Sequence, residues 1–257
     1  MGTYTYDQAW HDERERLAGI ERLWDQGTFA LLERLAVGPG SRVAEVGAGG
    51  GSVVEWLCER VGETGRVFAA DVYVKFLQPL AGGPVEVAEH DIIAAPLPAG
   101  EFDVVHARLL IEHIGMGALG NLLAGVRPGG LLAIEDYDFA LPATSYPPHP
   151  AAGRVTDAVL GVMASMGHDG ECGRKLPSEL EALGLEGVRA EGRVRLIRSG
   201  TPDTAFFRLS LESLREAIVS SGRAREEEIE EWLAAFAQPG HTLLSPILVA
   251  CHGRRPS

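Results

Sequence analysis

The chain has 257 residues, of which 46% are hydrophobic and 23% charged, and its mean hydropathy is +0.03. This composition excludes disorder for most of the chain and predicts a globular protein with a sizeable core. The formal net charge of −13 repels polyanions. Only two short arginine-containing pieces, residues 189–198 and Arg254-Arg255, oppose that charge, so we expect no nucleic-acid partner.

Cysteine usage and hydropathy exclude several further classes of protein. Cys58, Cys172 and Cys251 fall in no metal-ligand spacing, and we expect neither a disulfide framework nor a metal site. No stretch approaches 18 uninterrupted apolar residues, and the first residues lack an apolar signal core. We therefore expect a soluble, cytoplasmic protein without a membrane partner.

Helical periodicity begins over residues 10–37, and Gly38-Pro39-Gly40 ends this helix. From there, β-branched runs alternate with helical segments. The predicted strands are 42–46, 66–70, 84–88, 102–106 and 130–135, and the predicted helices are 52–61, 74–80 and 110–124. Strands separated by helical segments predict right-handed crossovers, and therefore a doubly wound α/β fold with helices on both faces of a parallel sheet.

A proline-rich connection over residues 141–150 ends this alternating pattern. Beyond it we predict helices 151–166, 177–183, 202–220 and 224–236, an alternating strand 187–197 and a final apolar run 243–251. We expect one domain with an N-terminal helical segment (1–37), a core (38–140), and a third part (141–257) that contributes helices and the last strands.

A glycine loop lies between the first predicted strand and the next helix. Gly47, Gly49, Gly50 and Gly51 permit positive φ and close backbone approach, and the helix that follows offers free N–H groups to an anion. Ser52 stands where the dinucleotide fingerprint requires Gly or Ala, and no P-loop lysine is present. A dinucleotide oxidoreductase is therefore disfavoured.

The segment Glu45-Val46-Gly47-Ala48-Gly49-Gly50-Gly51-Ser52 resembles motif I of the class I S-adenosylmethionine-dependent methyltransferases. Asp71 ends the second strand, where the acid of that family accepts hydrogen bonds from the ribose hydroxyls. His90-Asp91-Ile92 is similar to the adenine clamp, in which Asp91 accepts from the exocyclic amine and Ile92 packs on the ring. Residues 102–113 and 126–132 are similar to the family's fourth strand with its helix and to the turn into the fifth strand.

The resemblance spans residues 40–136 and implies a Rossmann-like, seven-stranded sheet with an N-terminal helical lid and a helical insertion before the last strand. It also implies S-adenosylmethionine as the cofactor and S-adenosylhomocysteine as the product. The cofactor-binding residues that it implies are Glu45, Gly47, Ala48, Gly49, Gly51, Ser52, Asp71, Val72, Asp91, Ile92, His106 and Ala107. Val72-Tyr73 departs from the polar residue common after the strand-two acid, which leaves the roles of the neighbours of Asp71 open.

The reaction of this family is an in-line displacement at a sulfonium methyl, in which orientation dominates and a base is optional. Ligands of open α/β sheets bind at the carboxyl ends of the strands. Candidate side chains there are His106, His113, Glu135, Asp136 and Tyr137. Of these we select His113 and Tyr137 as catalytic candidates, whereas we expect His106 to contact the cofactor through its backbone.

The acceptor is expected to be a small, mostly apolar metabolite, such as a natural-product intermediate of secondary metabolism, methylated on O, N or C. The candidate acceptor-binding residues are Tyr6, Trp10 and His11 in the lid, with Phe206 and Arg208 in the insertion. Two alternatives stay open: a protein that binds the cofactor but catalyses a cyclisation or rearrangement, and a nonenzymatic module that senses the cofactor. The chain is expected to be a monomer or homodimer.

Overall fold

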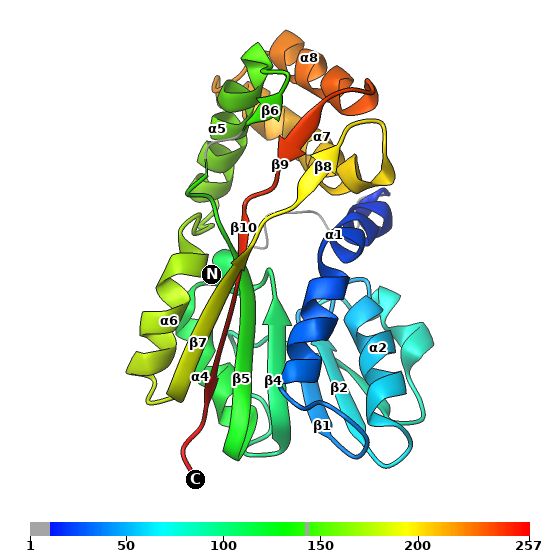
Figure 1. Cartoon of the computed structure of the whole chain (residues 1–257), viewed down its shortest axis with the longest axis vertical. Helices are drawn as coiled ribbons and strands as arrows, with labels where there is room; N and C mark the ends of the chain where they lie inside the picture. The colour runs from blue at the N-terminus through cyan, green and yellow to red at the C-terminus, as the bar shows by residue number, and fades with distance from the viewer. Residues whose placement is uncertain (1–10, 142–143) are drawn as a thin grey trace.

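The computed structural model describes residues 11–141 and 144–257 (Figure 1). Its main feature is a seven-stranded sheet in the order β3-β2-β1-β4-β5-β10-β7. The strands are β1 (Arg42–Val46), β2 (Arg66–Asp71), β3 (Val85–Glu89), β4 (Phe102–Arg108), β5 (Val126–Asp138), β7 (Glu186–Arg193) and β10 (Ile247–Arg254). Strands β1 to β5 are parallel, and β10 is antiparallel to both of its neighbours. The predicted fold class is confirmed.

Helices cover both faces of this sheet because each buries an apolar stripe against it. On one face, α1 (Glu13–Arg34) and α2 (Ser52–Val61) share a core with β1 and β2. On the other face lie α4 (Leu119–Gly125) and α6 (Cys172–Ala182). In Figure 1 these two helical layers stand on opposite sides of the strands.

A smaller helical cap stands at the carboxyl end of the sheet, in the upper half of Figure 1. It contains α5 (Pro150–Ser165), α7 (Ala205–Ser220), α8 (Glu226–Ala237) and a second sheet. The strands of the second sheet, in the order β6-β9-β8, are β6 (Ser145–Tyr146), β9 (Thr242–Leu244) and β8 (Leu196–Arg198). Helix α1 joins the two parts, since Leu23 and Trp24 belong to the core of the cap.

Gly19 marks the closest approach of α1 to the cap. A Cβ atom at this position would lie 2.5 Å from the backbone nitrogen of Phe206 in α7. Only glycine lets the two helices pack at this distance. The long N-terminal helix is therefore fixed against both the sheet and the cap.

Three of the predicted helices differ from the structure. The helix predicted over 110–124 is three shorter elements, α3 (Ile111–Ile114), the 3₁₀ turn η3 (Met116–Ala118) and α4, because Gly115 takes a φ of +86° and interrupts the first turn. The segment predicted as helix 74–80 is two 3₁₀ turns, η1 (Val74–Phe76) and η2 (Gln78–Leu80). The short helix predicted at 177–183 begins at Cys172 instead.

The two strands predicted nearest the C-terminus are also divided. The strand predicted at 187–197 comprises β7 in the large sheet and β8 in the small one, and the run 243–251 comprises β9 and most of β10. Pro246 separates β9 from β10, as expected of a residue without a backbone donor. Each of these two chain segments thus passes between the large sheet and the small sheet, which forms a wall of the cap. Among the described residues, no helix combines the length and apolar character that crossing a membrane requires.

Candidate functional site

The glycine loop connects β1 to α2 and has a backbone that other residues would adopt only with strain. Gly47, Gly49 and Gly51 have φ values of +70°, +53° and +93°. Gly50 lies beneath α1, where a Cβ atom would approach Glu21 Oε1 to 2.2 Å. Glycine at these positions therefore leaves a cradle between the loop and α1.

A cavity opens over this loop, and we call it the loop cavity. Predicted site residues that line it are Glu45, Gly47, Ala48, Gly49, Ser52, Asp71, Val72, Asp91 and Ile92. Gly51, His106 and Ala107 were predicted with them but are not among its lining residues. Tyr73 lines the cavity as well, and Glu13 and Glu21 contribute carboxylates from α1.

Asp71 fixes the glycine loop to the end of β2. Its Oδ2 atom accepts a hydrogen bond from Gly49 N at 2.9 Å, and its Oδ1 atom accepts from Tyr73 N at 3.0 Å. Asp91 is more exposed, and its Oδ1 atom accepts from Ile93 N at 2.9 Å. Both carboxylates thus accept hydrogen bonds from backbone N–H groups at the loop cavity.

Beside the loop cavity, a buried charge network crosses the centre of the sheet. His106 Nδ1 lies 2.6 Å from Glu45 Oε2, and His106 Nε2 lies 3.8 Å from Glu135 Oε1. Burial by itself lowers the pKa of His106, but the two carboxylates outweigh it and raise the pKa to about 9. His106 is therefore an imidazolium at neutral pH, with its side chain inside the sheet.

Glu135 is the second anion of this network. Its Oε2 atom accepts from Thr28 Oγ1 at 2.9 Å and lies 2.6 Å from Arg193 Nη2. Burial favours the neutral acid, but the hydrogen bond and charge of His106, together with the two arginines Arg193 and Arg108, lower the pKa of Glu135 overall. The network holds β1, β4, β5 and β7 together with α1 and fixes the position of Glu45 at the edge of the loop cavity.

A second cavity lies between the sheet and the cap, and we call it the cap cavity. Its walls are mostly apolar and come from α5, α7, α8 and the small sheet. They include Val155, Val159, Met163, Ile197, Phe206, Phe207, Trp232, Phe236 and Leu243. Arg16, Glu112, His113 and Tyr137 line the cavity at the sheet end, and further polar residues of its lining, among them Thr156, Asp157 and Ser210, lie in the cap.

The two cavities meet at Ile20 and Leu109, which line both. Leu109 follows β4 directly and has a φ of +53°, an unusual conformation for a residue with a branched side chain. Its backbone N–H donates to Glu135 O at 2.7 Å, which fixes this turn to β5. Backbone strain of this kind is typical of functional sites.

His113 is positioned in the cap cavity by two buried neighbours. Glu112 Oε1 lies 3.4 Å from His113 Nε2, and Glu112 Oε2 lies 3.4 Å from His168 Nε2. Burial lowers the pKa of His113 to about 4. The imidazole is therefore neutral at physiological pH, and the same burial makes it a weak base.

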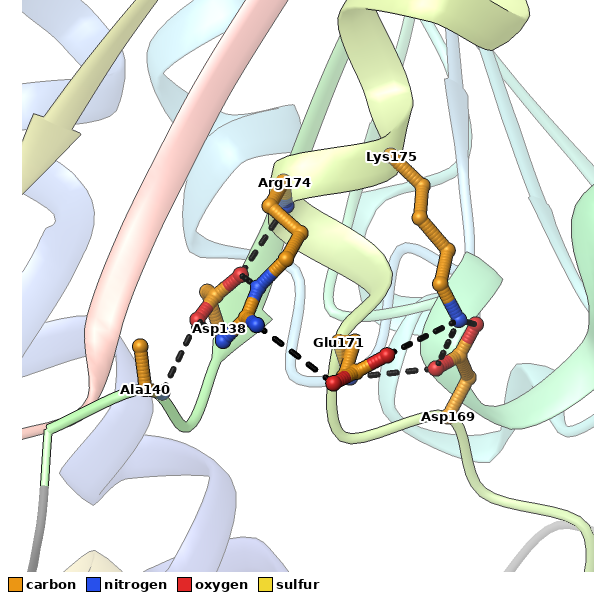
Figure 2. Close-up of polar contacts among 6 residues, drawn as sticks. All are labelled: Asp138, Ala140, Asp169, Glu171, Arg174 and Lys175. Atoms are coloured by element: carbon orange, nitrogen blue, oxygen red, sulfur yellow. Dashed lines mark hydrogen bonds and ion pairs between the residues drawn. The ribbon is translucent and has the colours of Figure 1, made fainter.

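A salt-bridge network holds the turn that carries His168 (Figure 2). Asp169 N donates to Glu112 O at 2.7 Å, and the Asp169 carboxylate accepts from Lys175 Nζ at 2.8 Å. The Arg174 guanidinium donates two hydrogen bonds to the Asp138 carboxylate at the end of β5, from Nε to Oδ2 at 2.6 Å and from Nη2 to Oδ1 at 2.7 Å. That contact lowers the pKa of Asp138. The start of α6 is thus tied both to β5 and to the Glu112 backbone.

Only some of the remaining predicted catalytic and acceptor-binding residues line a cavity. Tyr137 is buried beside the cap cavity, and its hydroxyl accepts from Trp24 Nε1 at 2.8 Å. Phe206 lines the same cavity, whereas Arg208 lines neither cavity and contacts Glu212. His11 lies against Asp12 and also lines neither cavity. Tyr6 and Trp10 lie outside the described residues.

Sequence reasoning missed Glu112, His168 and Arg16. Glu112 directly precedes His113, which is a signal that the sequence contains, but only the fold brings His168 to it. No group of three His, Cys, Asp or Glu side chains within 11–141 and 144–257 is arranged to hold a metal ion.

The chain is similar to known methyltransferases in sequence and in fold. Residues 44–134 match the profile of a family described as a methyltransferase domain. The ubiquinone/menaquinone biosynthesis C-methyltransferase of Ectopseudomonas mendocina is 24% identical over 217 residues, covering 80% of this chain and 79% of the relative. Methyltransferase str2 of Strobilurus tenacellus is 29% identical over 219 residues, covering 81% of this chain and 77% of the relative.

A solved structure shares the fold. It is phosphoethanolamine N-methyltransferase 2 of Haemonchus contortus in complex with phosphomonomethylethanolamine and S-adenosylhomocysteine. It superposes with a TM-score of 0.57 at 15% identity, over 91% of this chain and 53% of that one. The present chain thus spans about half the length of that protein.

Proposed function

The chain belongs to the class I S-adenosylmethionine-dependent methyltransferase family, and on that premise we propose that it methylates a small, mostly apolar acceptor. The observation that carries this proposal is the pair of cavities that meet at Ile20 and Leu109. One cavity has the cradle and acids of a cofactor site, and the other has the apolar walls of an acceptor site. A methyl group transferred in line has to pass between two such sites.

The loop cavity suits S-adenosylmethionine. The glycine cradle admits a ligand close to the backbone, and Asp71 and Asp91 offer acceptors for hydroxyl and amine donors. Glu21 Oε1 is buried at this cavity without a hydrogen-bond partner in the described chain, and an ammonium group would satisfy it. When bound, the cofactor supplies an electrophilic methyl group on a sulfonium.

The cap cavity supports an acceptor that is apolar apart from a reactive polar group. Its walls exclude water and hold the acceptor in place, which is the main contribution of the protein to a displacement of this kind. His113 is neutral and is proposed to take the proton from an acceptor hydroxyl. Glu112 lies against its Nε2 atom, and the ring of His168 packs against its ring with centroids 5.2 Å apart, so both neighbours orient it. Tyr137 is proposed to position the acceptor.

We further propose a hydroxylated aromatic ring, such as a quinol or phenol of secondary metabolism, as the acceptor. The name of one relative refers to carbon methylation in quinone biosynthesis, and removal of a phenolic proton activates both the oxygen and the ring carbons of such a molecule. The aromatic side chains Phe139, Phe206 and Trp232 are complementary to a flat ring.

Turnover with radiolabelled S-adenosylmethionine tests the proposal. The chain is incubated with a panel of phenols, quinols and primary amines, and labelled product and S-adenosylhomocysteine are quantified. We expect equal amounts of the two with at least one phenol or quinol. Product formed without S-adenosylhomocysteine would instead establish a cyclase or isomerase, and cofactor binding without turnover on the panel would point to a sensing module.

A further inference from the structure

The small sheet of the cap presents an apolar face to solvent. By register, Leu196 pairs with Leu244, and Thr242 pairs with both Arg198 and Tyr146, so these side chains share one face of the sheet. Tyr146 is 77% exposed, Leu196 71% and Leu244 40%, and Val194 next to β8 is 42% exposed. We call Tyr146, Val194, Leu196 and Leu244 the apolar patch. An antiparallel sheet with one buried face ordinarily has polar residues on the other.

The opposite face of the same sheet is the wall of the cap cavity. Ile197 and Leu243 alternate with the exposed residues, are buried, and line that cavity. Leu244 belongs to the patch and also lines the cavity. Leu141 and Pro246, which are not part of the patch, line the cavity as well. Leu141 is itself partly exposed. Exposed apolar surface therefore continues from the patch to the edge of the acceptor site.

Two arginines lie next to the patch, in a chain whose net charge is −13. Arg195 and Arg198 flank Leu196 and are both exposed. Neither guanidinium forms an ion pair within the described residues, whereas Arg215 in the same cap is paired with Glu226 and Glu230. Unpaired arginines beside exposed leucine and tyrosine side chains match the chemistry of an anionic lipid surface, where tyrosine favours the headgroup region.

We propose that the outer face of the small sheet docks on an anionic lipid bilayer, from which the apolar acceptor enters the cap cavity. The proposal rests on the proposed function, because it supplies the route by which a poorly water-soluble acceptor reaches the site. Docking of this kind is peripheral, and it departs from the expectation, drawn from hydropathy, that the chain has no membrane partner. The local arginines have to outweigh the repulsion between an anionic bilayer and the net charge of −13. Peripheral docking requires no helix that crosses the membrane, in keeping with the described helices.

Vesicle flotation of the full chain tests the proposal. Vesicles of phosphatidylcholine mixed with phosphatidylglycerol are expected to carry the chain with them, and vesicles of phosphatidylcholine alone to carry much less. High salt is expected to weaken the binding because it screens the arginines. The double variant Tyr146→Ser/Leu196→Ser and the double variant Arg195→Gln/Arg198→Gln are each expected to lower the vesicle affinity about tenfold.

A matched control removes exposed apolar surface elsewhere. Leu183 follows α6 and Val219 lies in α7, and each is 38% exposed. The double variant Leu183→Ser/Val219→Ser is expected to bind vesicles as the parent does. The proposal would be overturned if this control lost as much vesicle affinity as the patch variants. It would also be overturned if the patch variants bound vesicles as tightly as the parent. A concentration-dependent dimer in sedimentation that Tyr146→Ser/Leu196→Ser abolishes would overturn it too, because the patch would then be an interface between two copies.

Calorimetry with S-adenosylhomocysteine on the same preparations separates this proposal from the proposed function. A chain that binds the cofactor product but not anionic vesicles contradicts lipid docking alone. A chain that binds vesicles through the patch but not S-adenosylhomocysteine contradicts the proposed function and leaves the docking surface supported. The patch variants are expected to bind S-adenosylhomocysteine as the parent does, since the patch residues are not among those lining the loop cavity.

Discussion

His106 Nδ1 lies 2.6 Å from Glu45 Oε2, although 61 positions separate the two residues in the chain. The contact exists because β1 and β4 are parallel neighbours with Glu45 opposite His106. Both side chains are buried, so this contact exists only while the chain is folded. It links the first acid of the glycine-loop motif to the centre of the sheet.

The first prediction concerns the pH dependence of stability. The pKa of His106 is about 9 in the folded chain, against an ordinary value of 6.5. Its contribution is therefore complete below about pH 6.5 and is lost as the pH rises through 9. We expect the free energy of unfolding in urea to fall across this window. His106→Gln should lower it by about 3 kcal/mol at pH 7 and flatten the slope, because a buried carboxylate loses its partner.

His11→Gln serves as the control for that experiment, because the His11 side chain is 78% exposed. It should leave both the free energy of unfolding and its slope close to those of the parent. A parent whose stability does not change between pH 7 and 9 would contradict a charged His106.

The second prediction concerns the cofactor acids. We expect Asp71→Ala and Asp91→Ala each to weaken the binding of S-adenosylmethionine by about 1–3 kcal/mol, because ligand donors then lose their acceptors. Asp71→Ala should also loosen the loop, since Gly49 N and Tyr73 N lose their acceptor. Calorimetric affinities provide the measurement, and Glu63→Ala in an exposed loop is the control. Unchanged affinity in both variants would refute the assignment of the loop cavity.

The third prediction concerns His113. His113→Gln should lower kcat/KM for a phenolic acceptor by about 10², the lower end of the usual contribution of a general base, because its low pKa makes the imidazole a weak base. Cofactor affinity should be unchanged. Since burial lowers the pKa of His113 to about 4, the parent kcat/KM should show no inflection near pH 6.5 on the acid side. A pH–rate profile with such an inflection would mean that another group is the base.

The fourth prediction tests the strained turn between the cavities. At Leu109, whose φ is +53°, glycine should be more stable than alanine by about 1 kcal/mol, since only glycine adopts this conformation freely. At Leu123 in α4, the order should be reversed, because glycine weakens a helix by about 1 kcal/mol relative to alanine. Urea unfolding of the four variants measures both differences. A Leu109→Ala variant that is more stable than Leu109→Gly would exclude backbone strain at Leu109.

Much of the fold follows from local sequence signals. Helix α2 begins and ends at the predicted residues 52 and 61, because the glycine loop precedes it and Gly62 follows it. The same signals misjudge residues 187–197 and 243–251, where the chain passes from one sheet to another. Alternation of apolar and polar residues predicts a strand but does not identify the sheet to which it belongs.

The site residues also divide into those that a local sequence motif predicts and those that only the tertiary fold brings together. Residues whose positions depend on a local motif, such as Asp71 and Asp91, lie at the loop cavity as the motif implies. Contacts that depend on the tertiary fold were not predictable. The Glu112–His168 contact joins α3 to the turn before α6, and Ile20 reaches Leu109 only through the path of α1.

The central claim is that the loop cavity binds S-adenosylmethionine beside an acceptor site. Calorimetric titration of the purified chain with S-adenosylmethionine and S-adenosylhomocysteine tests it most directly, because no acceptor has to be known. We predict one-to-one binding of both molecules in the micromolar range. Absence of binding by both would contradict the claim, and the glycine loop would then serve another ligand or require the acceptor to bind first.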